Sequence, residues 1–394
     1  MTPRARLQAA IELGDAVVEA ARGGGAAADT LVQRYFATRR YAGSGDRRAV
    51  RGLLYDAIRR AGELPPSGRA LLLGLAEERP ELAALFDGGP HGPAPILERE
   101  AVAAAGVAPA WLVELLAASG LDPEARAALL GRAPLDLRVN ALKATRDVVL
   151  GGWPEAAAIA QLPAGLRLPG GTAIEQRAEH RDGLVEVQDA GSQHVGLAIG
   201  AAPGMTVVDL CAGAGGKSLA LAATMANRGW IVATDTDRGR LQRLAPRAER
   251  AGATIIESRL LDPGREAEAL ADLADTADVV LIDAPCSGTG TWRRNPEARW
   301  RLNPERLAAL VALQARLLDL AATLVAPGAT LGYVVCSLLD AEGAEQVDAF
   351  LARHPGWHAQ PIAMPVGRPR GAGLRLEPLH DDTDGFFVAR LGRP

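Results

Sequence analysis

MTVVDLCAGAGGKS, residues 205–218, joins an apolar run, a glycine-rich loop and the start of a helical pattern. Gly213, Gly215 and Gly216 allow a tight turn and a close approach of the backbone to a ligand. A P-loop is excluded, because its GxxxxGK[ST] spacing needs a glycine five residues before Gly216 and none is there. The pattern therefore predicts a strand, a ligand-binding loop and a helix whose first N–H groups face the ligand.

Short apolar runs and long helical patterns alternate from this stretch towards the end of the chain. Such alternation is typical of βαβ units and predicts an α/β fold with a doubly wound, Rossmann-like parallel sheet. In an open α/β sheet the ligand site lies at the carboxyl ends of the strands. The predicted strands are the apolar runs 205–210, 230–235, 254–256, 278–283, 329–335 and 385–391.

Asp235 ends the second apolar run, WIVATD. An acidic side chain at this place can accept hydrogen bonds from both hydroxyls of a ribose. The alternative role, a helix N-cap, suits Asp237 better. The glycine loop alone leaves the ligand open, since it fits a phosphate, a dinucleotide or the amino-acid end of S-adenosylmethionine.

Cys286 and Cys336 both lie at the carboxyl ends of predicted strands. Cys286 lies in DAPCSGTG, residues 283–290, and Cys336 follows the run LGYVV. Enzymes that methylate exocyclic amines often carry Pro-Pro and an aromatic residue here, and Cys286 replaces that aromatic residue. Buried structural thiols are the commonest fate of cysteine, but the Gly/Ser/Thr loop after Cys286 offers no apolar burial. We therefore interpret both cysteines as reactive thiols. The number and spacing of the three cysteines in the chain fit neither a disulfide framework nor a metal site.

The chain divides by composition into three parts. Residues 1–130 are rich in Ala, Leu and Arg with helical periodicity, which predicts a helical domain. Residues 131–201 mix short apolar runs with turns, as in a small α/β linker or cap domain. Residues 202–394 hold the alternating pattern. No run of about 18 apolar residues and no signal-peptide pattern occurs, so we expect a cytoplasmic protein without a membrane segment.

Basic residues gather locally, although the whole chain has a net charge of −4. Residues 34–60 hold eight arginines against Asp46 and Asp56, and WRRNPEARWR, residues 292–301, adds four arginines and two tryptophans. Arginines that bind phosphate and aromatic rings that stack on bases are typical of RNA binding. The alternative is that both clusters are charged surfaces that contact only solvent and bind no RNA. Lys143 and Lys217 are the two lysines among 43 basic residues, which suggests sites that need a compact ammonium group.

These motifs resemble the Sun/RsmB branch of the NOL1/NOP/Sun RNA cytosine-5 methyltransferases. The resemblance covers nearly the whole chain and is weakest in DRRAVRGLLYDAIRR (46–60), which is similar to part of a NusB-like RNA-binding domain. It implies a Rossmann-like class I methyltransferase sheet, preceded by a small α/β cap and an N-terminal all-α NusB-like domain. Its strongest segments are RVNALK (138–143), VQDAGSQ (187–193), DLCAGAGGKS (209–218), DAPCSGTGTWRRNP (283–296), VVCS (334–337) and DGFFVARL (384–391).

The family pattern implies that S-adenosyl-L-methionine is the cofactor. It implies Cys336 as the nucleophile and Cys286 as the thiol that releases the product. Asp283 would hold the exocyclic amine of the base or protonate its ring nitrogen 3, and Lys217 would polarise the base carbonyl or favour the thiolate. The expected cofactor-binding residues are Cys211, Ala212, Gly213, Gly215, Gly216, Lys217, Asp235, Asp262 and Asp283.

The sequence departs from the family pattern at three places. Gly213-Ala214 replaces the usual Ala-Pro of the cofactor loop, and Val335 replaces the threonine before the nucleophile. The acidic residue after the third strand is displaced, and Asp262 is its nearest candidate.

The resemblance implies an RNA substrate. Small-subunit rRNA is favoured, with tRNA as the alternative, and the other possibility is a non-catalytic RNA-binding or ribosome assembly protein that retains the fold. We expect a monomer with neither a metal nor a membrane partner. The residues expected to bind RNA are Lys143, Arg39, Arg40, Arg47, Arg48, Arg293 and Arg294.

Overall fold

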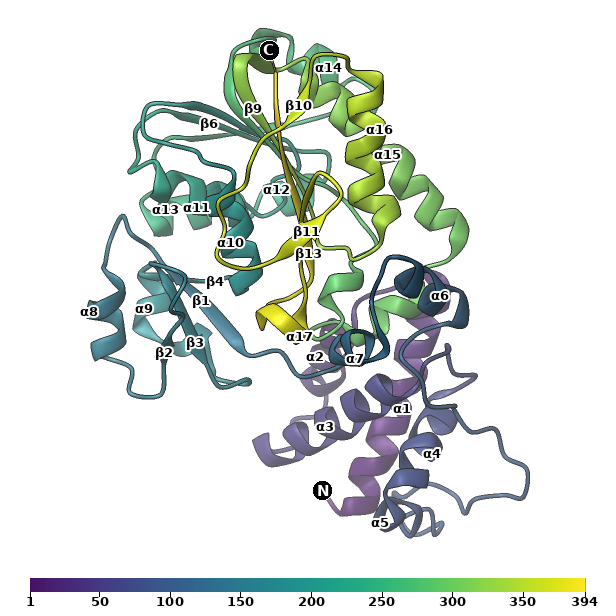
Figure 1. Cartoon of the computed structure of the whole chain (residues 1–394). Helices are drawn as coiled ribbons and strands as arrows, with labels where there is room; N and C mark the ends of the chain where they lie inside the picture. Colours follow the sequence, from purple (N-terminus) through teal and green to yellow (C-terminus); the bar gives the residue numbers. More distant parts are fainter. Residues whose placement is uncertain (394) are drawn as a thin grey trace. The chain divides into compact units, whose positions relative to one another are not determined.

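The computed structural model describes residues 1–393, and this chain forms two compact units (Figure 1). The first unit combines Met1–Gly131 with Thr291–Pro304. The second combines Arg132–Gly290 with the chain from Glu305 onward. The segment Thr291–Pro304 therefore leaves the second unit and returns to it, which no sequence pattern predicts.

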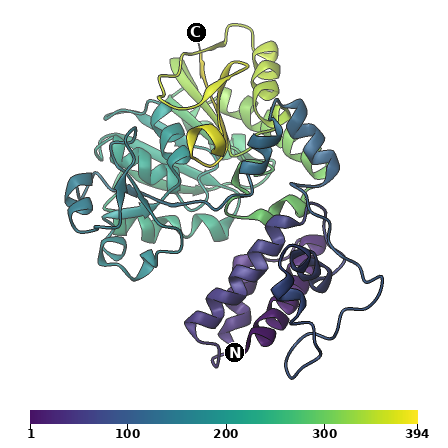
Figure 2. The same cartoon turned by 60° about the horizontal axis from the view of Figure 1, so that its bottom comes forward.

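The first unit is helical (Figure 2). Its helices pack around one apolar core that includes Leu7, Leu54 and Leu72. Its long helix α1 contacts α2, α3 and α4. The approach of α4 to α1 requires Gly68, because a Cβ at this position would lie 2.1 Å from Ile11 O. The helices are α1 (Pro3–Gly23), α2 (Ala28–Ala37), α3 (Ser44–Arg60), α4 (Gly68–Glu78), α5 (Pro80–Ala83), α6 (Ala110–Ala118) and α7 (Pro123–Ala128), with the 3-10 turn η4 (Pro296–Arg301).

The second unit begins with a small antiparallel sheet in the order β2-β3-β1-β4. Leu137 and Val139 of β1 pack with Trp153 and Leu166 in a separate core. These residues lie in the region expected as a cap domain, but they belong to the second compact unit. The elements are β1 (Leu135–Val139), α8 (Arg146–Gly151), β2 (Ala157–Ala158), β3 (Gly165–Leu168), α9 (Ala178–Arg181) and β4 (Val185–Val187).

A nine-stranded sheet forms the rest of the second unit, in the order β11-β12-β13-β9-β8-β5-β6-β7 with β10 paired to β13. Strands β5 to β9 pair in parallel, and β13 runs antiparallel to β9. The Rossmann-like fold class is confirmed, with an antiparallel edge added. The strands are β5 (Thr206–Asp209), β6 (Trp230–Asp235), β7 (Ile256–Leu260), β8 (Ala277–Asp283), β9 (Val325–Val335), β10 (His358–Ala359), β11 (Arg368–Arg370), β12 (Gly373–Leu376) and β13 (Phe386–Gly392).

Helices cover both faces of this sheet (Figure 1). Val207 packs in the cluster that contains Val195 of α10, whereas Val208 packs in the cluster that contains Leu317 of α15. Successive strand residues point to opposite faces, so the unbroken apolar runs follow from burial on both sides. The helices are α10 (Ala190–Ala198), α11 (Gly216–Thr224), α12 (Arg238–Leu241), α13 (Leu244–Ala251), α14 (Glu266–Ala269), α15 (Pro304–Ala322), α16 (Ala344–Arg353) and α17 (Pro378–Asp381).

The helical pattern that follows Asp235 predicts one helix over 237–252, but this segment forms two helices, α12 and α13. Pro246 explains the break, because its ring clashes with the carbonyl four residues earlier and it donates no hydrogen bond. Asp237 caps α12 by accepting a hydrogen bond from Arg240 N at 3.0 Å. The N-cap role suggested for Asp237 is therefore confirmed.

Within residues 1–393, none of the helices has the length and apolar character needed to cross a membrane. The same residues contain no group of three or more His, Cys, Asp or Glu side chains arranged to hold a metal ion.

Candidate active site

The glycine-rich loop lies between β5 and α11, as the sequence predicts. Gly213 and Gly215 have φ angles of +57° and +81°, which other residues rarely adopt. A Cβ on Gly215 would also lie 2.0 Å from Leu244 Cδ1. The loop conformation therefore depends on these two glycines.

Asp235 connects this loop to the end of β6. Its Oδ2 accepts a hydrogen bond from Gly213 N at 2.8 Å, and its Oδ1 accepts one from Asp237 N at 2.7 Å. Each carboxylate oxygen has a second lone pair, so these bonds leave capacity for hydroxyl donors. The ribose contact of Asp235 stays a prediction. Asp262 is exposed and lies two residues beyond Leu260, the partner of Asp235 in β7, and its cofactor contact also stays a prediction.

Asp209, at the end of β5, is a further candidate site residue, which the sequence analysis did not single out. Its side chain is fully buried, and Oδ2 accepts a hydrogen bond from Ser218 Oγ at 2.6 Å, while Oδ1 has no partner. Burial raises the pKa of Asp209 to about 7. A buried acceptor without a donor beside a glycine loop fits a ligand that carries a donor group. The signal in the sequence was an acid at the carboxyl end of a strand, the same signal that pointed to Asp235.

Lys217 and Asp283 form an ion pair across the same edge of the sheet. Lys217 Nζ lies 2.6 Å from Asp283 Oδ2, and the lysine side chain is 8% exposed. Burial by itself lowers the pKa of Lys217, but the charge and hydrogen bond of Asp283 outweigh it, so the pKa lies above its usual value. The charge of Cys336 also raises this pKa. Lys217 therefore stays an ammonium group that acts electrostatically on Cys336.

The two predicted reactive cysteines meet. Asp283 of β8 pairs with Val334 of β9, so the loops that follow both strands emerge side by side. Cys286 Sγ lies 3.4 Å from Cys336 Sγ. The hydrogen bond to Cys336 raises the pKa of Cys286 well above its usual range, and burial adds to this effect. Either sulfur can donate this hydrogen bond, and the raised pKa favours the thiol form of Cys286.

Cys211 is the third free cysteine and precedes the glycines of the loop. Burial raises its pKa well above the usual range, and the neighbouring carboxylates Asp209 and Asp235 add to the effect. Cys211 is a neutral thiol here, and its cofactor contact stays a prediction.

The expected basic surface of residues 34–60 belongs to the first unit. Arg40 and Arg48 are exposed. Arg39 lies over the Tyr35 ring at 3.6 Å, and Arg47 donates a hydrogen bond to Ala42 O at 2.9 Å. All four remain predicted RNA contacts, and Arg40, Arg47 and Arg48 are exposed whereas Arg39 is half-buried.

The segment 291–304 lies largely inside the helical unit. Arg299 is 1% exposed and donates hydrogen bonds to Ile58 O and Ala61 O, each at 2.6 Å. Trp300 Nε1 donates to Gly62 O at 3.1 Å. Arg293 is buried as well, which argues against its expected RNA contact, whereas the half-buried Arg294 keeps that role as a prediction. The arginines and tryptophans of residues 292–301 predicted an RNA-binding surface, but the composition of a segment does not show whether its side chains are buried.

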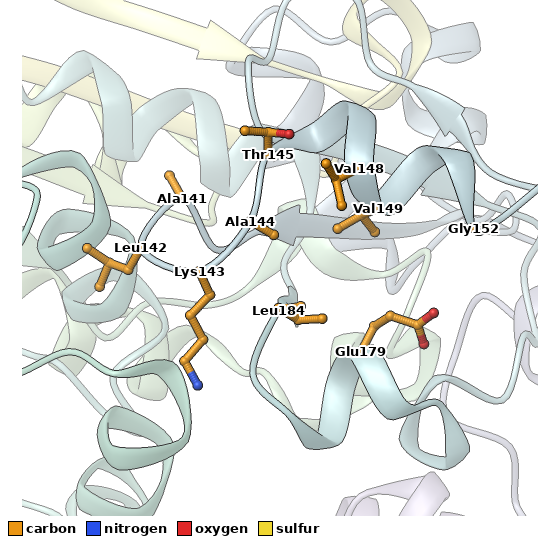
Figure 3. A pocket seen from close by; sticks show the side chains of 10 residues that line it. All are labelled: Ala141, Leu142, Lys143, Ala144, Thr145, Val148, Val149, Gly152, Glu179 and Leu184. Atoms are coloured by element: carbon orange, nitrogen blue, oxygen red, sulfur yellow. The ribbon is translucent and has the colours of Figure 1, made fainter.

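Lys143 supports the loop after β1. Its Nζ donates hydrogen bonds to Asp182 O at 2.9 Å and to Arg250 O at 2.6 Å, while the side chain remains partly exposed. Figure 3 shows Lys143 at a cavity of about 620 Å³ that also borders Val148, Glu179 and Leu184. Neither the cysteines nor the Lys217–Asp283 pair line this cavity. The RNA contact expected for Lys143 stays a prediction.

Comparisons with known proteins agree with the fold and the motifs. Residues 197–392 match the family of 16S rRNA methyltransferases RsmB/F. The chain is 40% identical over 270 residues to the probable ribosomal RNA small subunit methyltransferase B of Synechocystis, covering 65% of this chain and 59% of the relative. It is 40% identical over 210 residues to the ribosomal RNA small subunit methyltransferase B of Thermus thermophilus, covering 53% and 50%. The chain thus spans half to three fifths of these relatives' lengths.

Solved structures share the architecture. The crystal structure of PH0851 has a TM-score of 0.77 at 25% identity and covers 99% of both chains. The structure of NSun6 from Pyrococcus horikoshii with SFG has a TM-score of 0.64 at 18% identity, covering 71% of this chain and 97% of that chain, and shows the fold alone. Through residues 197–392, this chain belongs to the RsmB/F family of 16S rRNA methyltransferases.

Proposed function

We propose that this chain transfers a methyl group from S-adenosyl-L-methionine to carbon 5 of a cytosine in RNA, with small-subunit rRNA as the favoured substrate. The observation that carries the proposal is the pair of thiols, Cys286 and Cys336, 3.4 Å apart beside a buried lysine. The names of the relatives, ribosomal RNA small subunit methyltransferase B, support the choice of rRNA. A tRNA substrate is the alternative.

The residues around the glycine loop fit this cofactor. Gly213 and Gly215 leave room for a close backbone approach, and the unpaired Asp209 Oδ1 offers a buried acceptor. Asp235 would hold the ribose hydroxyls from the next strand. When bound, the cofactor supplies an electrophilic methyl group, and the chain's own residues must make carbon 5 of the base reactive.

Cys336 would make carbon 5 reactive by covalent catalysis. Its thiolate adds to carbon 6 of cytosine, forming a carbon–sulfur bond, while ring nitrogen 3 takes a proton from water. The electron pair of the former double bond then makes carbon 5 nucleophilic, and carbon 5 accepts the methyl group. Transfer of the carbon 5 proton to a base restores the double bond and breaks the carbon–sulfur bond. This step returns Cys336 as a thiolate, and ring nitrogen 3 gives its proton back to water.

The raised pKa of Cys286 supports this division of roles. A protonated Cys286 would donate a hydrogen bond to a thiolate on Cys336, 3.4 Å away, and the hydrogen bond between the two sulfurs is the largest cause of the raised pKa of Cys286. Once Cys336 is bonded to carbon, its thiolate no longer accepts this bond. Cys286 then releases its proton to water, and the resulting Cys286 thiolate accepts the carbon 5 proton, directly or through water.

Lys217 and Asp283 would complete the site. The Lys217 ammonium stabilises the Cys336 thiolate, as their electrostatic coupling supports. Asp283 is about one third exposed, and it would hold the exocyclic amine or the proton at ring nitrogen 3. Their ion pair holds the two side chains together at the edge of the site.

The exposed arginines of the first unit would bind the RNA backbone and add affinity rather than chemistry. The RNA contacts proposed here are Arg39, Arg40, Arg47, Arg48, Arg294 and Lys143.

The test combines purified protein, labelled S-adenosylmethionine and three substrates, which are small-subunit rRNA, small ribosomal subunits and tRNA. We expect 5-methylcytosine in the small-subunit rRNA, mapped by bisulfite sequencing, and its absence with Cys336→Ala. Methylation of tRNA alone would support the alternative substrate. A protein that binds RNA and cofactor but transfers no methyl group would support the non-catalytic alternative.

A further inference from the structure

Glu342 is a buried carboxylate that ties together the two cysteine-bearing loops. It ends the 3-10 turn η5 (Asp340–Glu342) and is 0% exposed. Its Oε1 accepts hydrogen bonds from Ser287 N at 2.8 Å and from Gln314 Nε2 at 3.0 Å. Its Oε2 accepts from Ser337 Oγ at 2.5 Å and from Ser287 Oγ. Four donors thus offset the cost of burying this carboxylate.

The two serines are the immediate neighbours of the two cysteines. Ser287 follows Cys286, and Ser337 follows Cys336. Their Oγ atoms lie 3.2 Å apart, and a single oxygen of Glu342 accepts from both. The Glu342 carboxylate therefore fixes the positions of Ser287 and Ser337, the residues that follow the two cysteines.

Further contacts fix the carboxylate and the loops. Tyr333 OH donates a hydrogen bond to Glu342 O at 2.6 Å, which anchors the turn to β9. Thr289 Oγ1 lies 3.1 Å from Ser337 Oγ, and Gly290 N donates to Cys336 O at 3.0 Å. Because these partners are themselves held, a change in the length of the Glu342 side chain must be taken up by the serines and the adjacent cysteines.

We infer that Glu342 is a positioning residue that sets the separation of the Cys286 and Cys336 sulfurs. Its consequence for methylation rests on the function proposed above, but the sulfur separation is measurable without RNA or cofactor. The inference makes side-chain length the decisive property, because both carboxylate oxygens must reach donors on two loops.

Two conservative variants separate length from charge. Glu342→Gln keeps the length, retains one oxygen acceptor and lets its NH₂ group donate to the serine hydroxyls, which rotate to accept. Glu342→Asp keeps the charge but withdraws both oxygens by one methylene. Glu345→Gln is the control, because Glu345 lies three residues further on and its side chain is exposed.

The readout is capture of both thiols by phenylarsine oxide. The reagent forms two arsenic–sulfur bonds, and its oxygen leaves as water with the two thiol protons, so no oxidant is needed. Mass spectrometry of digested protein identifies the bridged Cys286 and Cys336 peptides and distinguishes them from any product that involves Cys211. The rate of bridging reports how well the two sulfurs are placed.

Glu342→Gln and Glu345→Gln should bridge at a rate close to that of the parent protein, and Glu342→Asp should be slower by about tenfold or more, as expected when buried donors lose their acceptor. The inference would be overturned if Glu342→Asp bridged its thiols as fast as the parent protein, or if Glu342→Gln bridged them more slowly than Glu342→Asp. If Glu342→Asp does not fold, as judged by circular dichroism, the double variant Ser287→Ala/Ser337→Ala decides by the same assay, and an unchanged rate overturns the inference.

Methylation kinetics then connect the geometry to the proposed function. Glu342→Asp should lower kcat while KM for RNA and the affinity for S-adenosylmethionine stay unchanged, with Gln restoring most of kcat. A parent protein that bridges its thiols but methylates no RNA would refute the proposed function and leave the role of Glu342 in placing the sulfurs intact.

Discussion

Lys217 Nζ lies 2.6 Å from Asp283 Oδ2, which joins the helix after the cofactor loop to the strand that leads to Cys286. This ion pair connects the two halves of the candidate site, one expected to bind the cofactor and the other the base. Its lysine is one of only two in the chain.

Lys217→Met should lower kcat for methylation by about 100-fold or more, the scale for removing one preorganised donor from an active site. Lys217→Arg should restore little of the lost activity, because a planar guanidinium does not fit where a compact ammonium group is buried. Single-turnover kinetics check the loss, with Arg353→Met, an exposed residue, as the control. Activity of Lys217→Met within twofold of the parent would remove Lys217 from the chemistry.

The two cysteines should show opposite phenotypes with RNA. Cys336→Ala should abolish methylation, since no covalent adduct can form. Cys286→Ala should allow attack and methyl transfer but stall release, which traps a protein–RNA adduct visible by denaturing electrophoresis. The double variant should trap nothing. An adduct that forms with Cys336→Ala and vanishes with Cys286→Ala would reverse the two roles.

Asp209 should make the free protein less stable as pH rises. Its folded pKa of about 7 lies above the unfolded value, so the folded state binds the extra proton between pH 4 and 7. The stabilisation is complete below pH 4 and is lost as pH rises through 7, by an amount on the order of 4 kcal/mol. The free energy of unfolding, measured with urea at several pH values between 4 and 7, should depend less on pH for Asp209→Asn than for the parent protein. The same pH dependence in both proteins would contradict the raised pKa of Asp209.

Arg40 and Arg48 should contribute to the salt dependence of RNA binding. Replacing both by Glu should weaken binding and reduce the slope of log K against log salt by about two, since each lost phosphate contact removes about one unit. Filter binding at several salt concentrations measures the slope. Arg265→Glu/Arg353→Glu, which reverses two arginines of the second unit, should leave it unchanged, and an unchanged slope for the first pair would identify a merely solvated surface.

Arg299 should stabilise the helical unit. Arg299→Met removes the donor to the carbonyls of Ile58 and Ala61, and each buried acceptor left unpaired costs about 1–3 kcal/mol. Denaturant unfolding monitored by the tryptophans measures the loss. Arg48→Met, on the exposed side of α3, should change stability by less than about 0.5 kcal/mol. Equal stability of the two variants would mean that Arg299 is not part of the folded core.

The sequence alone predicted the alternation of strands and helices in the parallel part of the sheet and the residues that follow these strands. Asp235, Cys286 and Cys336 were predicted this way because the carboxyl ends of parallel strands meet at one edge of a sheet. Asp283 was predicted from the family resemblance. Local chemistry sufficed for Gly213 and Gly215 as well, since a loop with positive φ requires glycine.

Only the tertiary structure decided which polar residues are buried and what they contact. Glu342 and Arg299 look like ordinary surface charges in the sequence, and each is at most 1% exposed. The partners of Arg299 lie about 240 positions away along the chain. Burial and hydrogen bonding depend on segments that folding brings together, and no local pattern of charge or hydrophobicity encodes them.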